Sequence, residues 1–204
     1  MAKLGKEFYE RKDVVKLARE LLGKKLCTNI NGIYTAGIIT ETEAYAGEND
    51  KASHAYNNRR TPRNEFMFHA GGIAYVYLCY GLHHLFNVVT NAKDVPHAVL
   101  IRAIKPVDGI EEILLRRNHT KLAKNTAGGP GTVSQALGIS TKLNGTDLNE
   151  GNIWIEDVGI SFTKKEITAT PRIGVDYAGE DAKLPYRFLV KDADVTEKLK
   201  NPKH

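Results

Sequence analysis

Two short segments of this chain carry side chains that could act together on a flat, aromatic ligand. The first ends an apolar run and holds two carboxylates, in Glu41-Thr42-Glu43, and the second holds three tyrosines within residues 75–80. A carboxylate can accept a proton from an attacking water molecule, and a tyrosine ring can stack against a nucleobase. Because the chain is also basic, with a formal net charge of +5, the pairing suggests chemistry on a nucleobase.

The two carboxylates share one face of a predicted strand. Side chains alternate along a strand, so a strand over residues 33–45 places Ile39, Glu41, Glu43 and Tyr45 on the same side. One carboxylate could then be a general base in a partly desolvated cleft. The alternative is that both carboxylates lie at a solvated strand end or pair with arginines.

The tyrosines occupy both faces of a second predicted strand. Tyr75 and Tyr77 are two residues apart and share a face, whereas Tyr80 is out of phase, beside Gly81 at an expected turn. Tyr77 could therefore offer a stacking surface, and Tyr80 could be an exposed wedge of the kind that separates base steps in a duplex. The alternative is a packed aromatic core with satisfied hydroxyl groups.

The histidines and cysteines form no recognisable metal motif. His54 follows the carboxylates in a polar loop, and His83 and His84 follow the tyrosines, but none has metal-site spacing with Cys27 or Cys79. We therefore expect no metal and no cofactor.

Two groups of residues are candidates for contact with a phosphate backbone. The glycine-rich residues 128–132 lack the Gly-Lys-Ser/Thr ending of a P-loop, but a glycine-rich helix start can hold one phosphate through backbone N–H groups. We therefore consider Gly131 and Thr132 as phosphate contacts, with plain turn residues as the alternative. Arg59, Arg60 and Arg63 form a cluster of positive charge and are the other candidates.

The apolar pattern predicts an irregular succession of helices and strands. Asp13 is the expected N-cap of a helix that ends at Gly23, and Asn31-Gly32 predicts a tight turn between strands over residues 24–30 and 33–45. Thr61-Pro62 could open a short helix. Further strands are predicted at 73–80, 85–91, 98–104, 153–155, 172–175 and 186–190, with helices at 108–118 and 133–137. Because strands and helices do not alternate regularly, we expect an α+β fold with a largely antiparallel, curved sheet and peripheral helices.

The overall composition is typical of a soluble globular protein. The 204 residues, 42% of them hydrophobic, can bury a core without disulfides, and we expect one compact domain, 1–204, with its core over about 14–190. The two cysteines lie in apolar runs and are typical of buried thiols in a reducing compartment. Since no segment has the length of a membrane span, we expect a monomeric cytoplasmic protein without a membrane partner, associated with the nucleoid if the organism is prokaryotic.

Taken together, these motifs resemble the alkyladenine DNA glycosylase family, also called 3-methyladenine DNA glycosylase of the alkylpurine type. The order and spacing of the motifs carry the resemblance, which spans roughly residues 14–190. The matching stretches are residues 17–23 (LARELLG), 39–45 (ITETEAY), 52–54 (ASH), 61–64 (TPRN), 75–81 (YVYLCYG), 87–88 (NV), 99–103 (VLIRA), 129–130 (GP), 135–137 (QAL), 172–174 (RIG) and 185–188 (PYRF).

The resemblance implies a monofunctional DNA N-glycosylase that acts on duplex DNA containing damaged purines, without a metal or a Schiff base. It implies that Glu43 activates the attacking water and that Arg102 helps to hold that water. The backbone carbonyl of Ile173 would lie at a water-contacting position. The implied walls of the base pocket are Tyr45, His54 and Tyr77, and the implied wedge in the duplex is Tyr80.

One further expectation follows from the resemblance, and a second, which the resemblance leaves unsettled, concerns Glu41. Asn87 matches a pocket residue whose bulk disfavours the 2-amino group of normal guanine. Glu41 is expected to be structural, paired with an arginine, rather than the base.

Two other classes of function remain open at this point. A sugar glycosidase would use Glu41 and Glu43 as an acid and base pair, although residues two apart on one strand point the same way rather than flanking a bond. A nucleic-acid-binding module without catalysis would use the tyrosines for stacking, but it leaves Glu43 unexplained.

Overall fold

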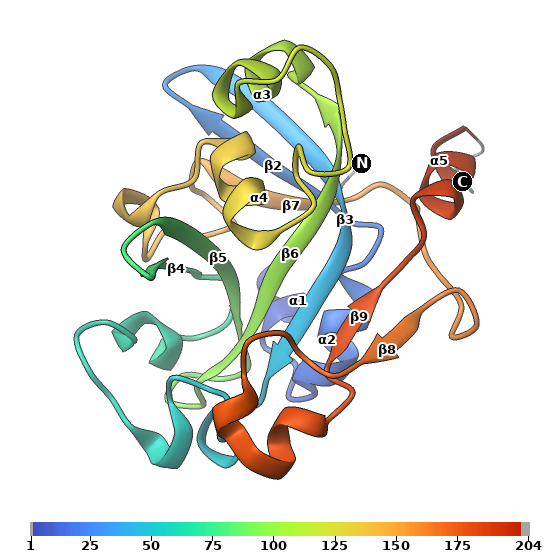
Figure 1. Ribbon diagram of the computed structural model, residues 1–204. Coiled ribbons are helices and arrows are strands. Elements are labelled where there is room, and N and C mark those ends of the chain that lie inside the picture. Colours follow the sequence, from blue (N-terminus) through green and yellow to red (C-terminus); the bar gives the residue numbers. More distant parts are fainter. Residues whose placement is uncertain (1, 201–204) are drawn as a thin grey trace.

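The centre of the molecule is a curved antiparallel sheet, which the computed structural model describes within residues 2–200 (Figure 1). Its strands run in the order β1-β7-β2-β3-β6-β5-β4, with β9 paired to β3 and β8 paired to β9. All the pairings described are antiparallel. The strands are β1 (Ala2–Lys3), β2 (Lys25–Ile30), β3 (Ile33–Tyr45), β4 (Ala74–Cys79), β5 (His83–Thr90), β6 (His97–Asp108), β7 (Ile153–Asp157), β8 (Thr168–Thr170) and β9 (Arg187–Leu189).

The β2–β3 hairpin forms where the local sequence predicts it. Asn31 and Gly32 both have positive φ, 55° and 81°, which the tightest hairpin turn requires of its two central residues and which asparagine and glycine adopt most readily. Strand β3 then continues to Tyr45 and pairs with β6 from Ala36 onwards. The Asn31-Gly32 turn therefore determines where β3 starts and that it runs antiparallel to β2.

The long β3–β6 pair is bent by irregular registers. The register shifts between Ala36 and Gly37 and again on both sides of Glu41, and such bulges add twist and bend the strands. At the first shift Gly37 lies against Ile104, where a side chain would collide. Strand β6 runs on to Asp108 rather than ending at Ile104 as predicted, because Pro106 is accommodated opposite Gly37 beside that shift.

Helices lie around the sheet and close its core. They are α1 (Lys6–Tyr9), α2 (Val14–Glu20), α3 (Ile110–Arg117), α4 (Pro130–Leu137) and α5 (Asp192–Lys200). The Asp13 side chain caps α2 by accepting from the Lys16 N–H at 2.9 Å, as predicted. Apolar side chains of α2, α3 and α4 join those of the sheet in one buried cluster. The α+β class and the single compact domain are therefore confirmed.

Three further local predictions were wrong. Helix α4 begins at Pro130 rather than at residue 133, because proline suits the first helical position. Thr61-Pro62 begins a turn, and the 3₁₀ helix η3 (Glu65–Phe68) starts only after Asn64. Residues 172–175 form no strand, since Gly174 has φ +74° and turns the chain. Strands β1 and β8 and helices α1 and α5 were not predicted.

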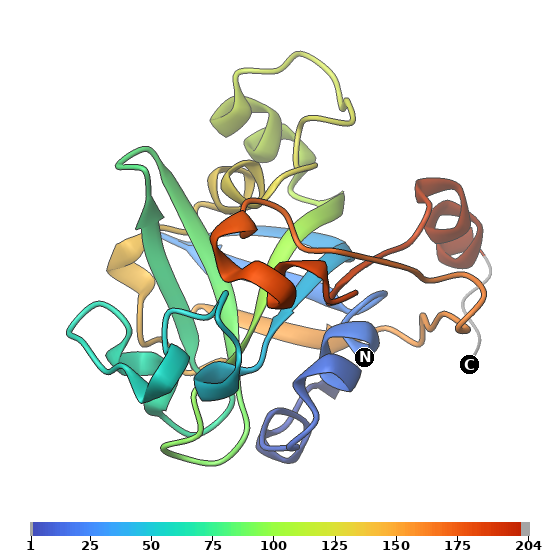
Figure 2. The same ribbon diagram turned by 60° about the horizontal axis from the view of Figure 1, so that its bottom comes forward.

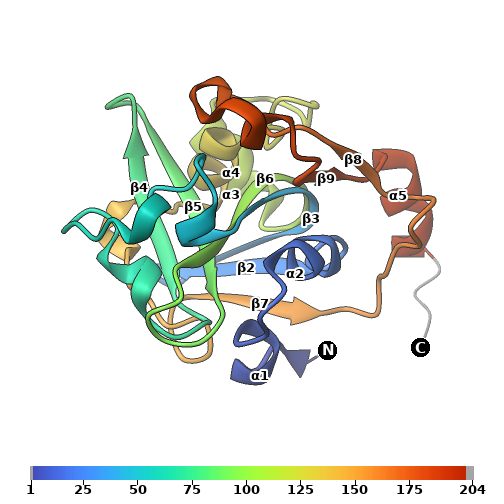
Figure 3. The ribbon, with the colours of Figure 1, turned by 90° about the horizontal axis from the view of Figure 1, so that it is seen from below.

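Three features surround the lower end of β3 and β6 in Figure 1. The first is the segment of residues 46–72, with the short 3₁₀ helices η1 (Gly47–Asn49), η2 (Tyr56–Asn58) and η3. The second is η5 (Asp176–Lys183), which lies beside the same end of the sheet (Figure 3). The third is the β4–β5 hairpin, whose tip projects away from the rest of the fold (Figure 2).

Candidate active site

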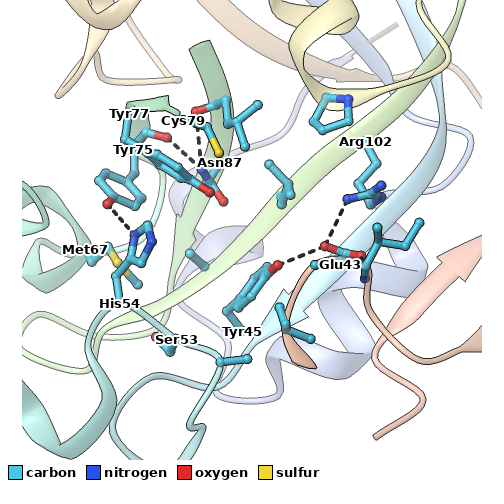
Figure 4. Close-up of a pocket in the computed structure, with 18 of the residues that line it drawn as sticks. Glu43, Tyr45, Ser53, His54, Met67, Tyr75, Tyr77, Cys79, Asn87 and Arg102 are labelled. Carbon is cyan, nitrogen blue, oxygen red and sulfur yellow. Dashed lines mark hydrogen bonds and ion pairs between the residues drawn. The ribbon is translucent and has the colours of Figure 1, made fainter. Parts of the chain in front are cut away.

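A cavity of about 480 Å³ opens at this end of the sheet. All seven residues that the sequence assigns to the chemistry or to the base pocket line it. They come from β3, β4, β5, β6, the 46–72 segment and the turn before η5, and are Glu43, Tyr45, His54, Tyr77, Asn87, Arg102 and Ile173. Figure 4 shows the rings of His54, Tyr75 and Tyr77 on one side of this space, and Glu43 with Tyr45 and Arg102 on the other.

Glu43 is fully buried, with 0% of the residue exposed, yet its carboxylate is well satisfied. Its Oε2 accepts from the Tyr45 hydroxyl at 2.9 Å, and its Oε1 accepts from the Ile173 backbone N–H at 2.8 Å. The Arg102 guanidinium lies 3.3 Å from Oε2. A buried carboxylate is tolerated when such donors replace water, so the fold holds Glu43 in place at the wall of the cavity. For Ile173 the structure thus gives a direct backbone N–H contact to Glu43.

Glu41 lies on the same strand but has a different set of partners. Its Oε1 accepts from Arg102 Nε at 2.8 Å, and the same oxygen lies 3.0 Å from Arg187 Nε. The prediction that Glu41 pairs with an arginine is therefore confirmed. Both carboxylates pair with the same guanidinium, which is not how an acid and base pair would flank a glycosidic bond.

Burial and charge tune the ionisable groups around Glu43. Burial lowers the pKa of Arg102, but the charges of Glu43 and Glu41 outweigh it and raise that pKa above its ordinary value. Burial and then the charge of Glu43 raise the pKa of Tyr45. Tyr45 therefore keeps its proton and donates it to Glu43 as a hydrogen bond.

His54, Tyr75 and Tyr77 form the aromatic side of the cavity. The His54 Nδ1 lies 2.9 Å from the Tyr75 hydroxyl, and the His54 ring meets Tyr77 edge-on at a centroid distance of 4.7 Å. Burial, followed by the charges of Arg63 and Arg59, lowers the pKa of His54 to about 4. The imidazole is consequently neutral near pH 7.

Asn87 is held in one orientation at the floor of the cavity. Its Nδ2 donates to the Tyr75 carbonyl at 3.1 Å and to the Leu85 carbonyl at 3.4 Å. Two backbone acceptors thus use both amide hydrogens, so the side chain is a fixed boundary rather than an adaptable one.

Tyr80 lies at the tip of the β4–β5 hairpin, at the rim of the same cavity, and is 89% exposed. Tyr80 and Gly81 have φ of 49° and 70°, and the Leu82 N–H bonds to the Cys79 carbonyl at 3.0 Å, which closes a tight turn. A bulky residue with positive φ is strained. The turn therefore presents a large aromatic side chain to solvent in a conformation that glycine or asparagine would adopt more easily.

Comparisons with known proteins agree with this geometry. The sequence profile of the methylpurine-DNA glycosylase family matches residues 7–194. The chain belongs to the methylpurine-DNA glycosylase family. A Chlamydia pneumoniae protein named "Putative 3-methyladenine DNA glycosylase" is 50% identical over 192 residues, which cover 94% of this chain and 96% of that protein. A Bacillus cereus protein of the same name is 50% identical over 189 residues, covering 89% of this chain and 92% of that protein.

The family assignment makes this chain a DNA N-glycosylase, a hydrolase of base-excision repair that acts on DNA. Within residues 2–200 of this glycosylase, no helix is long and apolar enough to cross a membrane. Over the same residues, no three side chains of His, Cys, Asp or Glu are grouped so that they could hold a metal ion.

Sequence reasoning missed one buried ion pair that shapes the site of this glycosylase. Arg172 binds the Asp50 carboxylate with both terminal nitrogens, at 2.5 and 2.8 Å, and also donates to the carbonyls of Ala44 and Asp181. Its guanidinium stacks 4.8 Å from the Tyr45 ring. The pair joins β3, the 46–72 segment and η5 directly before Ile173. No local signal reveals it, because Arg172 and Asp50 are 122 residues apart.

The candidate phosphate contacts differ in how accessible their charges are. Arg63 lies at the rim of the cavity, 5.1 Å from the Tyr77 ring centroid, and Arg59 is exposed. Arg60 is already bound to Glu65 and Asp94, so much of its charge is compensated. Gly131 packs against His83 next to the tip of the β4–β5 hairpin, and the Thr132 hydroxyl is bonded to Gly129. Of the three arginines, Arg59 and Arg63 are therefore better placed than Arg60 to meet a phosphate.

Proposed function

We propose that this glycosylase flips damaged purines out of duplex DNA and hydrolyses their N-glycosidic bond with a water activated by Glu43, leaving an abasic site. The substrate class comprises 3-methyladenine, 7-methylguanine, hypoxanthine and ethenoadenine. One observation supports this most strongly: a buried carboxylate faces a cavity that has aromatic side chains on its opposite side.

The chemical step needs one base and an electrostatic partner for the sugar. Water attacks C1′, the C1′–N bond breaks, and the purine leaves with the electron pair of that bond. Glu43 takes a proton from the attacking water and stabilises the positive charge that develops on the sugar. Two oxygens of Glu43 already accept from Tyr45 and Ile173, which orients the remaining lone pairs. Arg102 would hold the water close to the carboxylate.

The flipping step needs a replacement for the base that leaves the stack. Extruding a nucleotide costs a few kcal/mol, and less when damage has already weakened pairing. Tyr80, exposed at the rim of the cavity, would enter the gap in the duplex. Stacking of the extruded base on the pocket aromatics returns about 1–3 kcal/mol. Together, this stacking and the insertion of Tyr80 offset most of the cost of extrusion.

The pocket chemistry fits an alkylated purine, whose ring often carries a positive charge. A neutral His54 places no positive charge beside such a ring to repel it, and Tyr45 is neutral as well. A cationic purine is a good leaving group without acid help, whereas hypoxanthine would need a proton. The fixed amide of Asn87 would meet the 2-amino group of normal guanine. Since one chain lines the whole cavity, we infer that the enzyme works as a monomer.

The direct test is base release from duplexes that contain hypoxanthine or an alkylated adenine. Wild type should release the base, while Glu43→Gln should bind the same duplex with unchanged affinity and release none. Affinity should also fall steeply with salt, because phosphate contacts dominate binding to DNA. Should Glu41→Gln abolish release while Glu43→Gln does not, the assignment of the base is wrong.

A further inference from the structure

The guanidinium of Arg102 is shared unequally between two carboxylates. Its Nε is hydrogen-bonded to Glu41 at 2.8 Å, while its Nη1 lies 3.3 Å from Glu43 without a comparable hydrogen bond. Arginine and carboxylate normally prefer a bidentate arrangement with two parallel hydrogen bonds. The partly buried Arg102 therefore lies near Glu43 but does not form with it the pairing that these two groups favour.

The reason lies behind Arg102, on the side away from the cavity. Glu41 accepts a hydrogen bond from the Nε of Arg102, and Arg187 from β9 forms an ion pair with the same Glu41 oxygen at 3.0 Å. Glu41 and Arg187 do not line the cavity, whereas Arg102 and Glu43 do. Two arginines and two carboxylates thus form a chain in the order Arg187, Glu41, Arg102, Glu43.

The consequences of removing Glu41 follow from the charged and titratable groups that face Glu43. These are Arg102 from β6, Arg172 from the turn before η5, Arg187 from β9 opposite Glu43, and Glu41 and Tyr45 from β3. Among the residues that the structure describes, Glu43 is then the one carboxylate that remains paired with Arg102. A bidentate pair with Glu43 would occupy the lone pairs that a water molecule needs.

We propose that Glu41, supported by Arg187, is a positioning residue that holds Arg102 back from Glu43 and keeps the Glu43 carboxylate free to accept a proton. This inference rests on the proposed function, in which Glu43 is the base. Glu41 would not touch the DNA or the water. Its effect would pass entirely through Arg102.

The test compares Glu41→Gln with a matched control on another part of the chain. The control, Glu112→Gln, removes the carboxylate of the Glu112–Arg116 pair, whose N–O distance is also 2.8 Å. The two pairs are similarly buried: the Glu112 and Arg116 side chains are 25% and 15% exposed, and those of Glu41 and Arg102 are 17% and 11% exposed. Glu112 lies on α3, outside the cavity lining. Both variants should lower the melting temperature to a similar extent, so a loss of stability alone would affect both enzymes alike.

The expected result is specific to the Glu41 variant. Single-turnover base release should fall by about 10- to 100-fold in Glu41→Gln, with unchanged affinity for the duplex, because a small displacement at a reacting centre has effects of this size. Glu112→Gln should release the base at the wild-type rate, and Glu41→Asp, which keeps the charge, should recover part of the loss. Wild-type release in Glu41→Gln, or an equal loss in Glu112→Gln, would overturn the proposal.

A second measurement separates this proposal from the proposed function. The Arg102 Nε–H resonance of ¹⁵N-labelled protein, identified by its loss in Arg102→Gln, should move upfield in Glu41→Gln and stay in place in Glu112→Gln. This readout needs no substrate. If wild type released no base, the proposed function would fail while the resonance would still report on the position of Arg102. An unshifted resonance would refute the positioning role alone.

Discussion

The buried imidazole of His54 makes a quantitative prediction about stability at acid pH. Its pKa is lowered from 6.5 to about 4, chiefly by burial and then by the charges of Arg63 and Arg59. The unfolded chain therefore binds this proton more readily than the folded protein does. The stability that a neutral His54 contributes is fully present above pH 6.5 and is lost progressively as the pH falls towards 4.

The size of the effect follows from the two pKa values. At pH 4.5 the unfolded histidine is almost fully protonated and the folded one mostly neutral, which corresponds to a loss of about 2.5 kcal/mol in the free energy of unfolding. Urea unfolding of wild type and of His54→Gln, each at pH 7 and pH 4.5, measures it. Because glutamine does not titrate, His54→Gln should lose about 2.5 kcal/mol less than wild type over this interval.

The comparison with His54→Gln is needed because other groups titrate in the same range. Burial also lowers the pKa of His97, and this contribution is common to both proteins. Equal losses of stability in wild type and His54→Gln between pH 7 and pH 4.5 would refute the reasoning, since the burial of His54 would then carry no cost for its charged form.

Three further predictions concern binding, stability and selectivity. Tyr80→Ala should weaken binding to a duplex that contains a damaged base by about 10-fold or more while leaving affinity for the free base unchanged, and titrations with both ligands measure this. Asp50→Asn leaves Arg172 buried without its counter-charge and should lower the free energy of unfolding by about 3–5 kcal/mol, measured by urea denaturation; a loss below 1 kcal/mol would contradict a structural role for the pair. Asn87→Ser should increase release of normal guanine relative to alkylated adenine, and an unchanged ratio would show that Asn87 does not limit the pocket.

The parts of the fold that depend on local sequence could be predicted. The Asn31-Gly32 turn fixes the β2–β3 hairpin, and Asp13 fixes the start of α2, because each acts on its own neighbours. Residues 172–175 were predicted as a strand from their apolar pattern, but Gly174 turns the chain and Arg172 is drawn inwards by Asp50. Arg172 and Asp50 are 122 positions apart, so the pattern of apolar residues around Arg172 does not reveal their interaction.

For the site, the sequence indicated which residues come together but not all the contacts that hold them. Glu43, Arg102 and the pocket residues lie together, as the family resemblance implied. The sequence predicted an arginine partner for Glu41, but it could not show that Arg102 and Arg187 share this carboxylate or that the Ile173 N–H donates to Glu43. These contacts depend on how separate strands meet, and residue types alone do not determine such distances.

At the tip of the β4–β5 hairpin, the proposed action on DNA is favoured by a residue that lowers the stability of the free protein. A tyrosine with φ of 49° ahead of Gly81 costs the folded protein roughly 1–2 kcal/mol relative to a residue that favours this conformation, and Asn-Gly is the pair that such a turn prefers. Tyr80→Asn should therefore raise the melting temperature while it removes the proposed wedge. If Tyr80 is that wedge, selection or engineering for thermal stability alone would favour a less active enzyme at this position, and a screen that also measures base release would retain the tyrosine.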